Sequence, residues 1–517
     1  MMSSLYIGAT GMIALGEGMS TISNNLANLN TVGYKERLHL FEDLMSTGVT
    51  APSNASNDGI GPTNYSQLGH GSVTSAIISR FYENGALETT NTVTNLAING
   101  KGFFQVSSEN GSFYTRAGNF YFNNEGWLVH PSGMKLMGKR LSNGNVSGAL
   151  EAVRLDPATE MYMPAKATSK ASIISNLGMT EARTTNASNP FFSLALSYNS
   201  AADPLMGASG YSNSLMIYDS NGRQHELEIN YDLVEHNGDG RKIIQYTVSI
   251  PPDEDGRAGF EGTVGAGLLL SGTMTFTSNG QLQNMSAFAP SSGADIHNLN
   301  TWTSLAVGAD GIPLDLTFIN RDNAGNPVTA SQSMKLDFGL GFDSPAGMQA
   351  AGIGQDPNNL PGYTGAGNIA PETGLQNRTH AYNGEVSTIS RSNDGYAEGY
   401  MQGIRIDKKG VLSVRYDNGQ ELEKFQIPLY TFQGEQNLKA EGNNLYSATK
   451  ESGAAIEGMA DSGNLGSIIS RSLEMSNVDI ARQFTYMIVN QRGFQFNSKV
   501  ITVSDSMLQK ALELKRA

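Results

Sequence analysis

Residues 473–514 read LEMSNVDIARQFTYMIVNQRGFQFNSKVITVSDSMLQKALEL, and the spacing of apolar side chains in this stretch decides the fold. From Ile480 onward, steps of four and three residues trace one face of a helix. At about 1.5 Å per residue, this helix is roughly 60 Å long and needs a partner to cover its stripe. Gln491, Ser498 and Asp505 interrupt the stripe, and its apolar members are Ile480, Phe484, Met487, Phe494, Ile501, Leu508 and Leu512.

The predicted partner lies at the other end of the sequence, in residues 1–34. Its stripe follows the heptad spacing of a coiled coil and consists of Leu5, Gly8, Met12, Leu15, Met19, Ile22, Leu26 and Leu29. Glu17 is the one charged residue before Lys35, and each glycine inside the pattern costs about 1 kcal/mol relative to alanine. We expect the two ends to pair as a coiled coil and many copies to bundle. An ordinary terminal helix docked on a globular core is the plainer alternative.

Composition limits the classes of function. The chain has 517 residues, enough for several domains, and its net charge of −14 argues against a nucleic-acid partner. It contains no cysteine, which excludes disulfides, thiolate catalysis and cysteine metal sites. No run approaches the eighteen apolar residues of a membrane span, so we expect no membrane insertion. The N-terminus lacks the pattern of a cleavable signal peptide.

Two motifs at opposite ends of the chain carry a family resemblance. Residues 24–35, NNLANLNTVGYK, resemble the signature shared by bacterial flagellar rod and hook proteins. Residues 473–479 and 490–495 match the same family, and both motifs occur in the family's order. The signature positions are Asn28, Asn30, Thr31, Gly33, Tyr34 and Lys35 near the first helix, and Ser476, Asn477 and Val478 before the last one.

Residues 35–69 are predicted to form an extended linker, because they lack regular periodicity and are rich in Ser, Asn, Gly and Thr. Within them, Phe41 and Met45 resemble the family's export motif, a phenylalanine followed four residues later by a hydrophobic residue. The resemblance therefore implies recognition by the flagellar type III export apparatus.

The rest of the chain is predicted to be β-rich and nested. Residues 70–165 and 376–469 resemble the family's inner β-domain, which is thus built from two separated segments. Residues 166–375 form an insert with hairpin signals at 219–222 and 278–280, and we expect one or two outer β-domains there. The predicted fold class is mainly β with terminal α-helices, in which residues 1–34 and 470–517 form the axial coiled coil.

No catalytic, cofactor-binding or metal site is predicted. Gly100-Lys101-Gly102 lacks the remaining residues of a phosphate-binding loop, and His225-Glu226 lacks the second histidine of a zinc-protease helix. The acidic run 253–256 follows two prolines where a calcium loop would need ligands. We therefore expect a protein that is not an enzyme.

The resemblance implies a structural subunit of the flagellar hook, a flexible curved tube that transmits torque from rod to filament as a universal joint. The implied partners are copies of itself, the distal rod, the hook cap, the hook–filament junction proteins and the export apparatus. The implied location is the extracellular flagellum. Two alternatives stay open: a distal rod subunit, and a secreted glycan-binding or glycan-cleaving β-protein, which would need a cleft with paired carboxylates.

Overall fold

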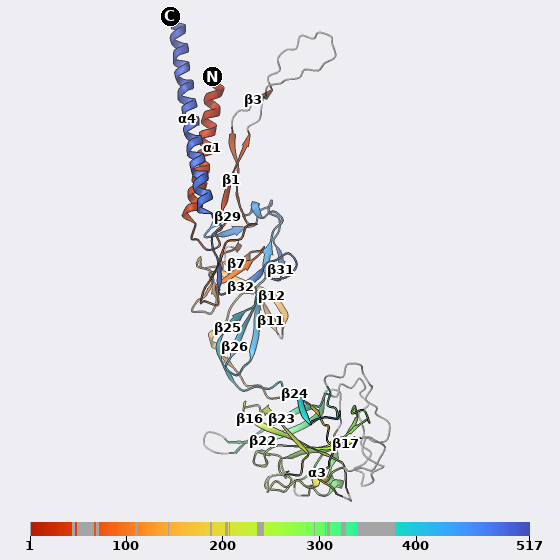
Figure 1. Ribbon diagram of the computed structural model, residues 1–517. Coiled ribbons are helices and arrows are strands. Elements are labelled where there is room, and N and C mark those ends of the chain that lie inside the picture. Colours follow the sequence, from red (N-terminus) through yellow and green to blue (C-terminus); the bar gives the residue numbers. More distant parts are fainter. Residues whose placement is uncertain are drawn as a thin grey trace. The chain divides into compact units, whose positions relative to one another are not determined.

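The computed structural model divides the chain into two compact units (Figure 1). The helical unit comprises Met1–Met161 and Met401–Ala517, and the inserted unit comprises Tyr162–Tyr400. The structure describes residues 2–43, 47–48, 67–68, 72–108, 111–142, 144–186, 189–201, 205, 207–234, 242–293, 295–305, 307, 311–321, 327–339 and 378–516.

The two long helices of the helical unit lie side by side and run antiparallel (Figure 1). Helix α1 spans Met2–Ala27 and helix α4 spans Ile480–Arg516. Ser4 contacts Ser504 at one end of the pair, and Asn25 contacts Gln483 at the other. Because Ser504 already lies opposite Ser4, the last three turns of α4 extend beyond the start of α1. The predicted pairing of the chain ends is confirmed.

The segment after α1 contains a strand where the sequence predicts a linker, and the segment before α4 contains strands where it predicts a helix. Strand β1, Arg37–Asp43, pairs antiparallel with β4, Ser72–Ser79, so this part of the predicted linker is ordered by a strand partner distant in sequence. Strands β32, Ser467–Ser470, and β33, Ser472–Glu474, precede α4 and pair with β6 and β5. The last helix therefore begins at Ile480 and not near residue 470.

The β-body of the helical unit is assembled from both sides of the insert. Strand β11, Lys135–Ser142, pairs with β27, Glu421–Gln426, and β8, Gly111–Thr115, pairs with β30, Leu445–Ser447. The other short strands are β2 Thr47–Gly48, β3 Gln67–Leu68, β5 Leu87–Thr89, β6 Leu96–Asn99, β7 Phe104–Ser108, β9 Tyr121–Phe122, β10 Leu128–Val129, β12 Asn145–Ala152, β25 Gly399–Ile406, β26 Val411–Tyr416, β28 Leu429–Thr431, β29 Lys439–Gly442 and β31 Ile456–Gly458.

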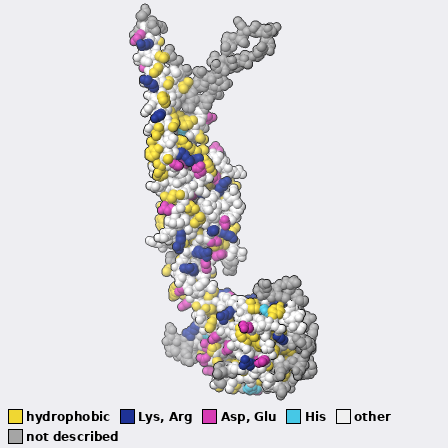
Figure 2. Space-filling model, in the orientation of Figure 1, with side chains coloured by type: hydrophobic (Ala, Val, Ile, Leu, Met, Phe, Trp, Pro, Cys, Tyr) yellow, Lys and Arg dark blue, Asp and Glu magenta, His cyan; other side chains and the backbone are white. Residues whose placement is uncertain are grey.

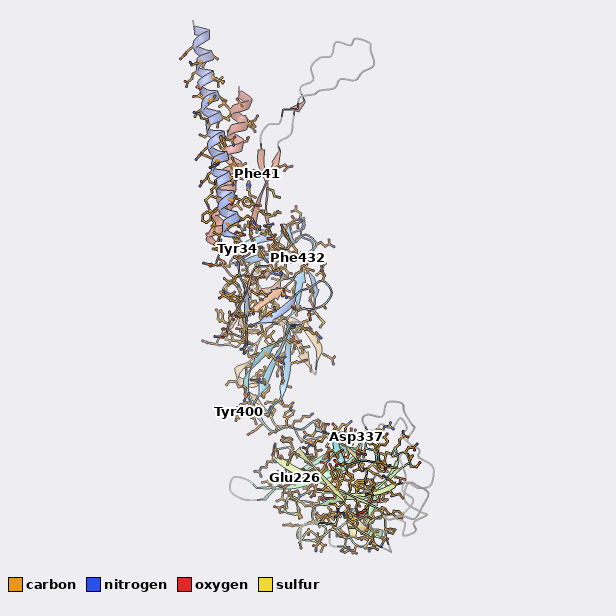
Figure 3. All side chains as sticks on the ribbon, in the orientation of Figure 1. Tyr34, Phe41, Glu226, Asp337, Tyr400 and Phe432 are labelled. Atoms are coloured by element: carbon orange, nitrogen blue, oxygen red, sulfur yellow. The ribbon has the colours of Figure 1, made fainter. Side chains whose placement is uncertain are left out.

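Aromatic side chains fill part of this body. Phe81, Phe103, Tyr114, Tyr430 and Phe432 are buried together in edge-to-face or tilted contacts (Phe432 is labelled in Figure 3). These aromatic residues come from both segments of the β-body, before and after the insert, and form one core.

The described residues of the inserted unit form a four-stranded and a seven-stranded sheet. The four-stranded sheet has the order β22-β23-β14-β24, and the seven-stranded sheet runs β15-β16-β17-β18-β20-β21, with β19 paired to β18. Both predicted hairpins are confirmed, since β15 pairs with β16 and β18 with β19. The strands are β13 Tyr162–Met163, β14 Lys170–Asn176, β15 Tyr211–Tyr218, β16 Gln224–Leu233, β17 Lys242–Ser249, β18 Leu268–Phe276, β19 Leu282–Met285, β20 Phe288–Ala289, β21 Thr303–Ser304, β22 Ile312–Arg321, β23 Pro327–Asp337 and β24 Ser387–Asn393, and the short helices of the chain are α2 Pro157–Glu160 and α3 Ser193–Leu196. The fold is mainly β with terminal helices, as the sequence predicts.

Candidate functional site at the helix pair

The helix pair is joined at glycines, which contact both polar residues and members of the predicted apolar stripes. An added Cβ at Gly8 would lie 2.9 Å from Cγ1 of Ile501, and at Gly11 it would lie 2.7 Å from Nδ2 of Asn497. The reverse arrangement occurs at Gly493, where the added Cβ would lie 3.0 Å from Leu15. These positions define the seam of the pair: Gly8, Gly11, Leu15, Gly18, Asn25, Gln483, Asn490, Gly493, Asn497, Ile501 and Ser504.

The glycines of α1 are thus explained by close approach, which offsets their poor helix propensity. Gly16 is the contrast, because an added Cβ there meets nothing within 4 Å. On α4, Gln483, Asn490 and Ser504 are buried at steps of seven and fourteen residues, and Asn497 between them is partly buried, so polar side chains recur on the face turned to α1. Ile501 contacts Gly8 within this face, whereas many of the other apolar residues of α4 are exposed.

We predict that Gly11→Leu opens the seam, because overpacking a close contact typically costs about 1–3 kcal/mol. Hydrogen exchange of the α1 amides, read by mass spectrometry, should accelerate at least about fivefold. Gly16→Leu is the matched control, since it makes the same change on the same helix in open space. Equal exchange rates in the two variants would show that the glycines are not needed for pairing.

The predicted packing residues divide between the seam and the surface. In α1 and the turn after it, Ile22 is buried, and the other predicted residues are partly buried, namely Leu5, Met12, Leu15, Met19, Leu26 and Leu29. In α4, Met487, Ile501 and Leu508 are partly buried, whereas Ile480, Phe484, Phe494 and Leu512 are exposed. Their role in contacts between subunits stays a prediction.

One chain therefore leaves a long apolar surface on the helix pair. Phe484 is 51% exposed, Ile488 52% and Phe496 71%, and α1 adds Tyr6 and Ile13. Figure 2 shows hydrophobic side chains along the helices. We call these residues the exposed apolar face: Tyr6, Ile13, Ile480, Phe484, Tyr486, Ile488, Val489, Phe494, Phe496, Val500, Val503, Met507 and Leu512. A surface of this kind marks an interaction site in a protein.

At its base, the helix pair is tied to the chain that leaves α1. The Asn25 carboxamide donates to the carbonyl of Arg37 at 2.8 Å and to Gln483 at 3.2 Å, and its oxygen accepts from Tyr34 OH at 3.0 Å. Gln483 in turn donates to the Glu36 carboxylate at 2.6 Å. Three segments, namely α1, the stretch after it and α4, thus meet in one buried polar network (Tyr34 is labelled in Figure 3).

A fully buried charge cluster adjoins this network, since Lys35 lies between Tyr34 and Glu36 in the chain. Lys35 Nζ donates to Glu474 Oε1 at 2.7 Å, and Arg116 Nε donates to Glu474 Oε2 at 2.9 Å. Lys35 also donates to the carbonyl of Glu83 at 2.8 Å, and the Gly85 amide donates to Glu474 at 3.0 Å. The cluster connects the segment after α1, the β-body and the segment before α4. We call Lys35, Arg116 and Glu474 the junction cluster.

Burial acts on the pKa values of Lys35 and Glu474 in opposite directions. Burial and the neighbouring Arg116 charge lower the pKa of Lys35 to about 8, although Glu474 acts against this. Burial alone would raise the pKa of Glu474, but the charges of Arg116 and Lys35 outweigh it, and the pKa lies below its ordinary value. Glu474 therefore stays ionised at neutral pH and holds both cations.

We predict a pH dependence from Lys35. In the unfolded chain its pKa is about 10.4, so between pH 7.5 and 9.5 the folded chain releases a proton that the unfolded chain keeps. The free energy of unfolding of the helical unit should therefore rise by about 2 kcal/mol over this window. Lys35→Met should lack this rise, measured by urea unfolding at both pH values. An identical pH dependence in the variant would show that Lys35 does not titrate here.

The two signatures meet at the junction. The Gly33 amide donates to the Glu474 carbonyl at 2.7 Å. Gly33 has a φ of +68°, and a Cβ added to it would lie 2.5 Å from the backbone nitrogen of Ala117. The Asn477 carboxamide accepts from the Glu36 amide at 2.6 Å and donates to the carbonyls of Arg80 and Glu83.

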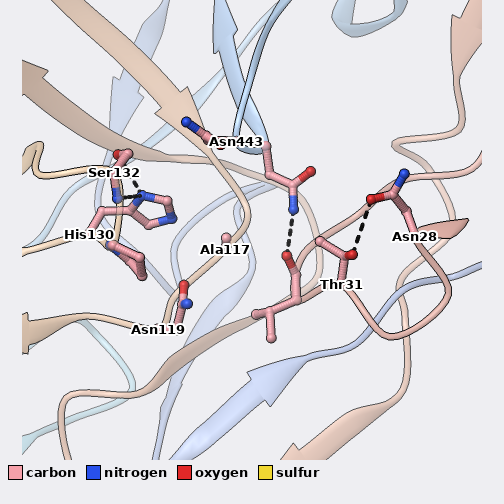
Figure 4. A pocket seen from close by; sticks show the side chains of 10 residues that line it. Asn28, Thr31, Ala117, Asn119, His130, Ser132 and Asn443 are labelled. Carbon is pink, nitrogen blue, oxygen red and sulfur yellow. Dashed lines mark hydrogen bonds between the residues drawn. The ribbon is translucent and has the colours of Figure 1, made fainter. Parts of the chain in front are cut away.

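The remaining signature residues differ in burial. Val478 is buried, Ser476 is partly buried, and Asn30 is exposed. The Asn28 side chain accepts a hydrogen bond from the Thr31 hydroxyl at 3.2 Å (Figure 4).

Sequence reasoning missed several residues of this site. Arg116, Glu36 and Gln483 are buried polar residues whose partners come from distant segments, which no local spacing reveals. The glycines at 8, 11 and 18 could have indicated the seam from the sequence. They are spaced by three and seven residues on one helix face, and residues without a side chain let a second helix approach closely. In α4, Asn490, Asn497 and Ser504 repeat at seven residues beside the apolar stripe.

The predicted export motif is only partly described. Phe41 lies on β1, 48% exposed, with its ring 4.6 Å from that of His39 and near Gly18 of α1 (Figure 3). Met45 lies outside the described residues. Among the residues that the structure describes, no cluster of His, Asp and Glu could hold a metal ion, and no helix is long and apolar enough to cross a membrane.

Four family models match the chain. Residues 5–35 match the model described as flagella basal body rod protein, and residues 469–514 match the flagellar basal body rod FlgEFG protein C-terminal. Residues 97–179 match the flagellar hook protein FlgE/F/G D1 domain, and residues 198–396 match the flagellar basal body protein FlaE D2 domain. The matched segments include both signatures.

Curated relatives resemble the chain along its whole length. The flagellar hook protein FlgE of Treponema pallidum (strain Nichols) is 29% identical over 524 residues, and that of Borreliella burgdorferi is 28% identical, each covering 100% of both chains. FlgE of Salmonella typhimurium is 26% identical and covers 98% of both chains. Among solved structures, the chain resembles the crystal structure of Helicobacter pylori flagellar hook protein FlgE2. The match covers 75% of this chain and 100% of the FlgE2 chain, with 14% identity and a TM-score of 0.44.

Proposed function

This chain belongs to the bacterial flagellar rod and hook family and is a subunit of the flagellar hook, and from this premise we propose that its helix pair forms the inner wall of a flexible tube. In this tube, the exposed apolar faces of neighbouring copies pack together. The tube acts as a universal joint that transmits torque from the rod to the filament.

The exposed apolar face is the observation that carries this proposal. The seam uses glycines, polar residues, Leu15 and Ile501 inside one chain, while Phe484, Ile488 and other apolar side chains of α4 are exposed. Burying a side chain of this size is worth about 1.5–3 kcal/mol. Repeated in every copy, these contacts supply a strong drive to polymerise that a monomer cannot satisfy.

The junction cluster supports the mechanical part of the proposal. A tube wall that transmits torque needs a firm connection between the helices and the β-body. Lys35, Arg116 and Glu474 provide this connection through charged hydrogen bonds that are shielded from water. The β-units, whose surface ion pairs are weak, are free to exchange contacts during bending.

Assembly of the purified full-length chain tests the function. After precipitant-induced polymerisation, electron microscopy should show curved tubes. Straight rods would favour the distal-rod alternative, which the comparisons do not favour. Soluble monomers at all precipitant concentrations would contradict the proposal, and binding to glycans would revive the third alternative.

The proposed partners beyond copies of the chain are the distal rod, the hook cap, the hook–filament junction proteins and the type III export apparatus. The proposed location is the extracellular hook, reached through this apparatus. We also propose that the protein is not an enzyme, since a structural subunit needs no reaction. These partners follow from the family and from the order of flagellar assembly.

We predict that Phe41→Ala lowers the amount of secreted protein several-fold while its intracellular level stays the same. Phe41 and Met45 are the candidate contacts with the export gate, and alanine removes the aromatic ring that would bind there. Immunoblots of culture medium and cells measure both amounts, with Leu40→Ala as a control on the same strand. Normal secretion of the Phe41 variant would remove the motif assignment and leave the polymer unaffected.

A further inference from the structure

The apolar side chains of the helix pair lie on two opposite sides of the seam. Gly11 of α1 faces Asn497 of α4, and each further residue turns the side chain by about 100° around the helix axis. Because the two helices run antiparallel, side chains turned by the same angle and in the same sense from these two residues lie on the same side of the pair. This relation assigns each apolar residue outside the seam to one side.

One side of the pair carries apolar residues from both helices at seven-residue spacing. They are turned by about 60–120° from the seam, and each keeps part of its surface accessible. We call them the heptad face: Leu5, Met12, Met19 and Leu26 of α1, with Met487 and Phe494 of α4. These are residues that the sequence analysis assigned to the contact between the helices, and the seam leaves them without full cover.

The opposite side of the pair carries a second apolar surface, which comes from α4. Its members are turned by about 60–120° in the other sense, and Phe496 is 71% and Val489 60% exposed. We call this surface the valine strip: Val489, Phe496, Val500, Val503 and Met507. The heptad face and the valine strip therefore point away from each other, and one chain cannot bring them into contact.

The exposed charges of α4 follow the same division. The cations Arg492, Lys499 and Lys510 border the valine strip. The carboxylates of Asp505 and Glu513 lie on the side of the heptad face. Two valine strips in contact would bring like charges together, whereas a valine strip against a heptad face brings opposite charges together. Charge complementarity thus favours a contact between the two unlike surfaces.

The two surfaces also match in length. At about 1.5 Å per residue, the valine strip from Val489 to Met507 is about 27 Å long, and the heptad face from Leu5 to Leu26 is about 32 Å long. We propose that the heptad face of one copy of this chain binds the valine strip of a second copy.

This inference rests on the proposed function and states which surfaces meet in the tube. A contact between unlike surfaces is heterologous, so each added copy leaves one heptad face and one valine strip free, and growth continues. A contact between like surfaces would close after two copies. The opposite placement of the two surfaces therefore suits a polymer.

Val500→Asp should raise the critical concentration for polymerisation at least about tenfold, because it places an unpaired carboxylate in the contact. Val500 is partly exposed in the single chain, so the monomer should fold normally. Ser506→Asp is the matched control, since Ser506 is exposed on the same helix, opposite α1, and belongs to neither surface. The control should polymerise like the wild type. Equal critical concentrations in the two variants would overturn the role of the valine strip.

The absence of cysteine from the chain permits a direct test of which surfaces meet. Met12→Cys and Met19→Cys each place a thiol on the heptad face, and Val500→Cys places one on the valine strip. Tubes of a double variant, with one thiol on each surface, are treated with a short bismaleimide, which tolerates an imperfect register better than a disulfide. A denaturing gel should then show a ladder of cross-linked multimers. Tubes of each single-cysteine variant should yield monomers, because the thiol faces a surface without one.

Three other results are informative. Cross-linked dimers from a single-cysteine variant would show that like surfaces meet, which overturns the inference. Tubes in which neither double variant forms multimers would show that the two surfaces are not neighbours, which overturns it as well. Failure of the wild type to form tubes would instead contradict the proposed function.

Discussion

Deletion of residues 480–517 should abolish polymer growth and leave the β-sheets folded. The cut falls after Asp479, because Ser472–Glu474 is strand β33 and Glu474 belongs to the junction cluster. The deletion removes most of the exposed apolar face, and α1 alone, with four glycines in its interior, is a poor helix in water. Without α4, no copy retains a surface from which a tube wall can be built.

Light scattering and electron microscopy measure the loss of assembly in this deletion variant. Thermal unfolding followed by β-sheet circular dichroism should show the transition of the inserted unit, Tyr162–Tyr400, unchanged. A longer deletion from residue 470 is the instructive comparison, since it also removes β33 and should destabilise the β-body. Tubes grown from the shorter deletion variant would show that the β-units drive assembly.

Glu474→Ala should lower the free energy of unfolding of the helical unit by about 3–5 kcal/mol. The substitution leaves Lys35 and Arg116 buried without their shared anion, and removing one partner of a buried ion pair has a penalty of this size. The Gly85 amide loses its acceptor as well. This effect exceeds that of most single substitutions.

Tryptophan fluorescence during urea unfolding measures this effect. Trp127 lies in the helical unit, and Trp302 in the inserted unit can be replaced by Phe so that only Trp127 reports. Glu441→Ala is the control, because Glu441 pairs with Lys439 at 2.8 Å on the surface and such pairs contribute about 0–1 kcal/mol. A loss no larger than that of the control would mean that the cluster does not stabilise the junction.

Much of the fold could be predicted from local sequence patterns. The helices at the two ends follow from apolar spacing, and the hairpins at 219–222 and 278–280 follow from their turn residues. These features depend on residues within a few turns of one another. The nested order of the sheets came from family resemblance and not from local patterns.

The seam and the junction could not be predicted in this way. The heptad stripe of α4 led to the expectation that Phe484 and Phe494 face the partner helix, whereas Asn490 and Asn497 do so next to glycines. The choice between these faces depends on how closely two backbones approach, which is a property of both helices together. Similarly, Lys35 and Glu474 are 439 residues apart, and only the folded chain brings them into contact.

Hydrogen exchange of α4 in monomer and polymer tests the central claim, that the outward face of the helix pair is buried between subunits. Residues 507–516 extend past the start of α1 at Met2, so α1 does not cover them within one chain. Their amides should exchange freely in the monomer and at least about a hundredfold more slowly in assembled tubes. Equal exchange in the two states would contradict the claim, because the helices would then remain exposed after assembly.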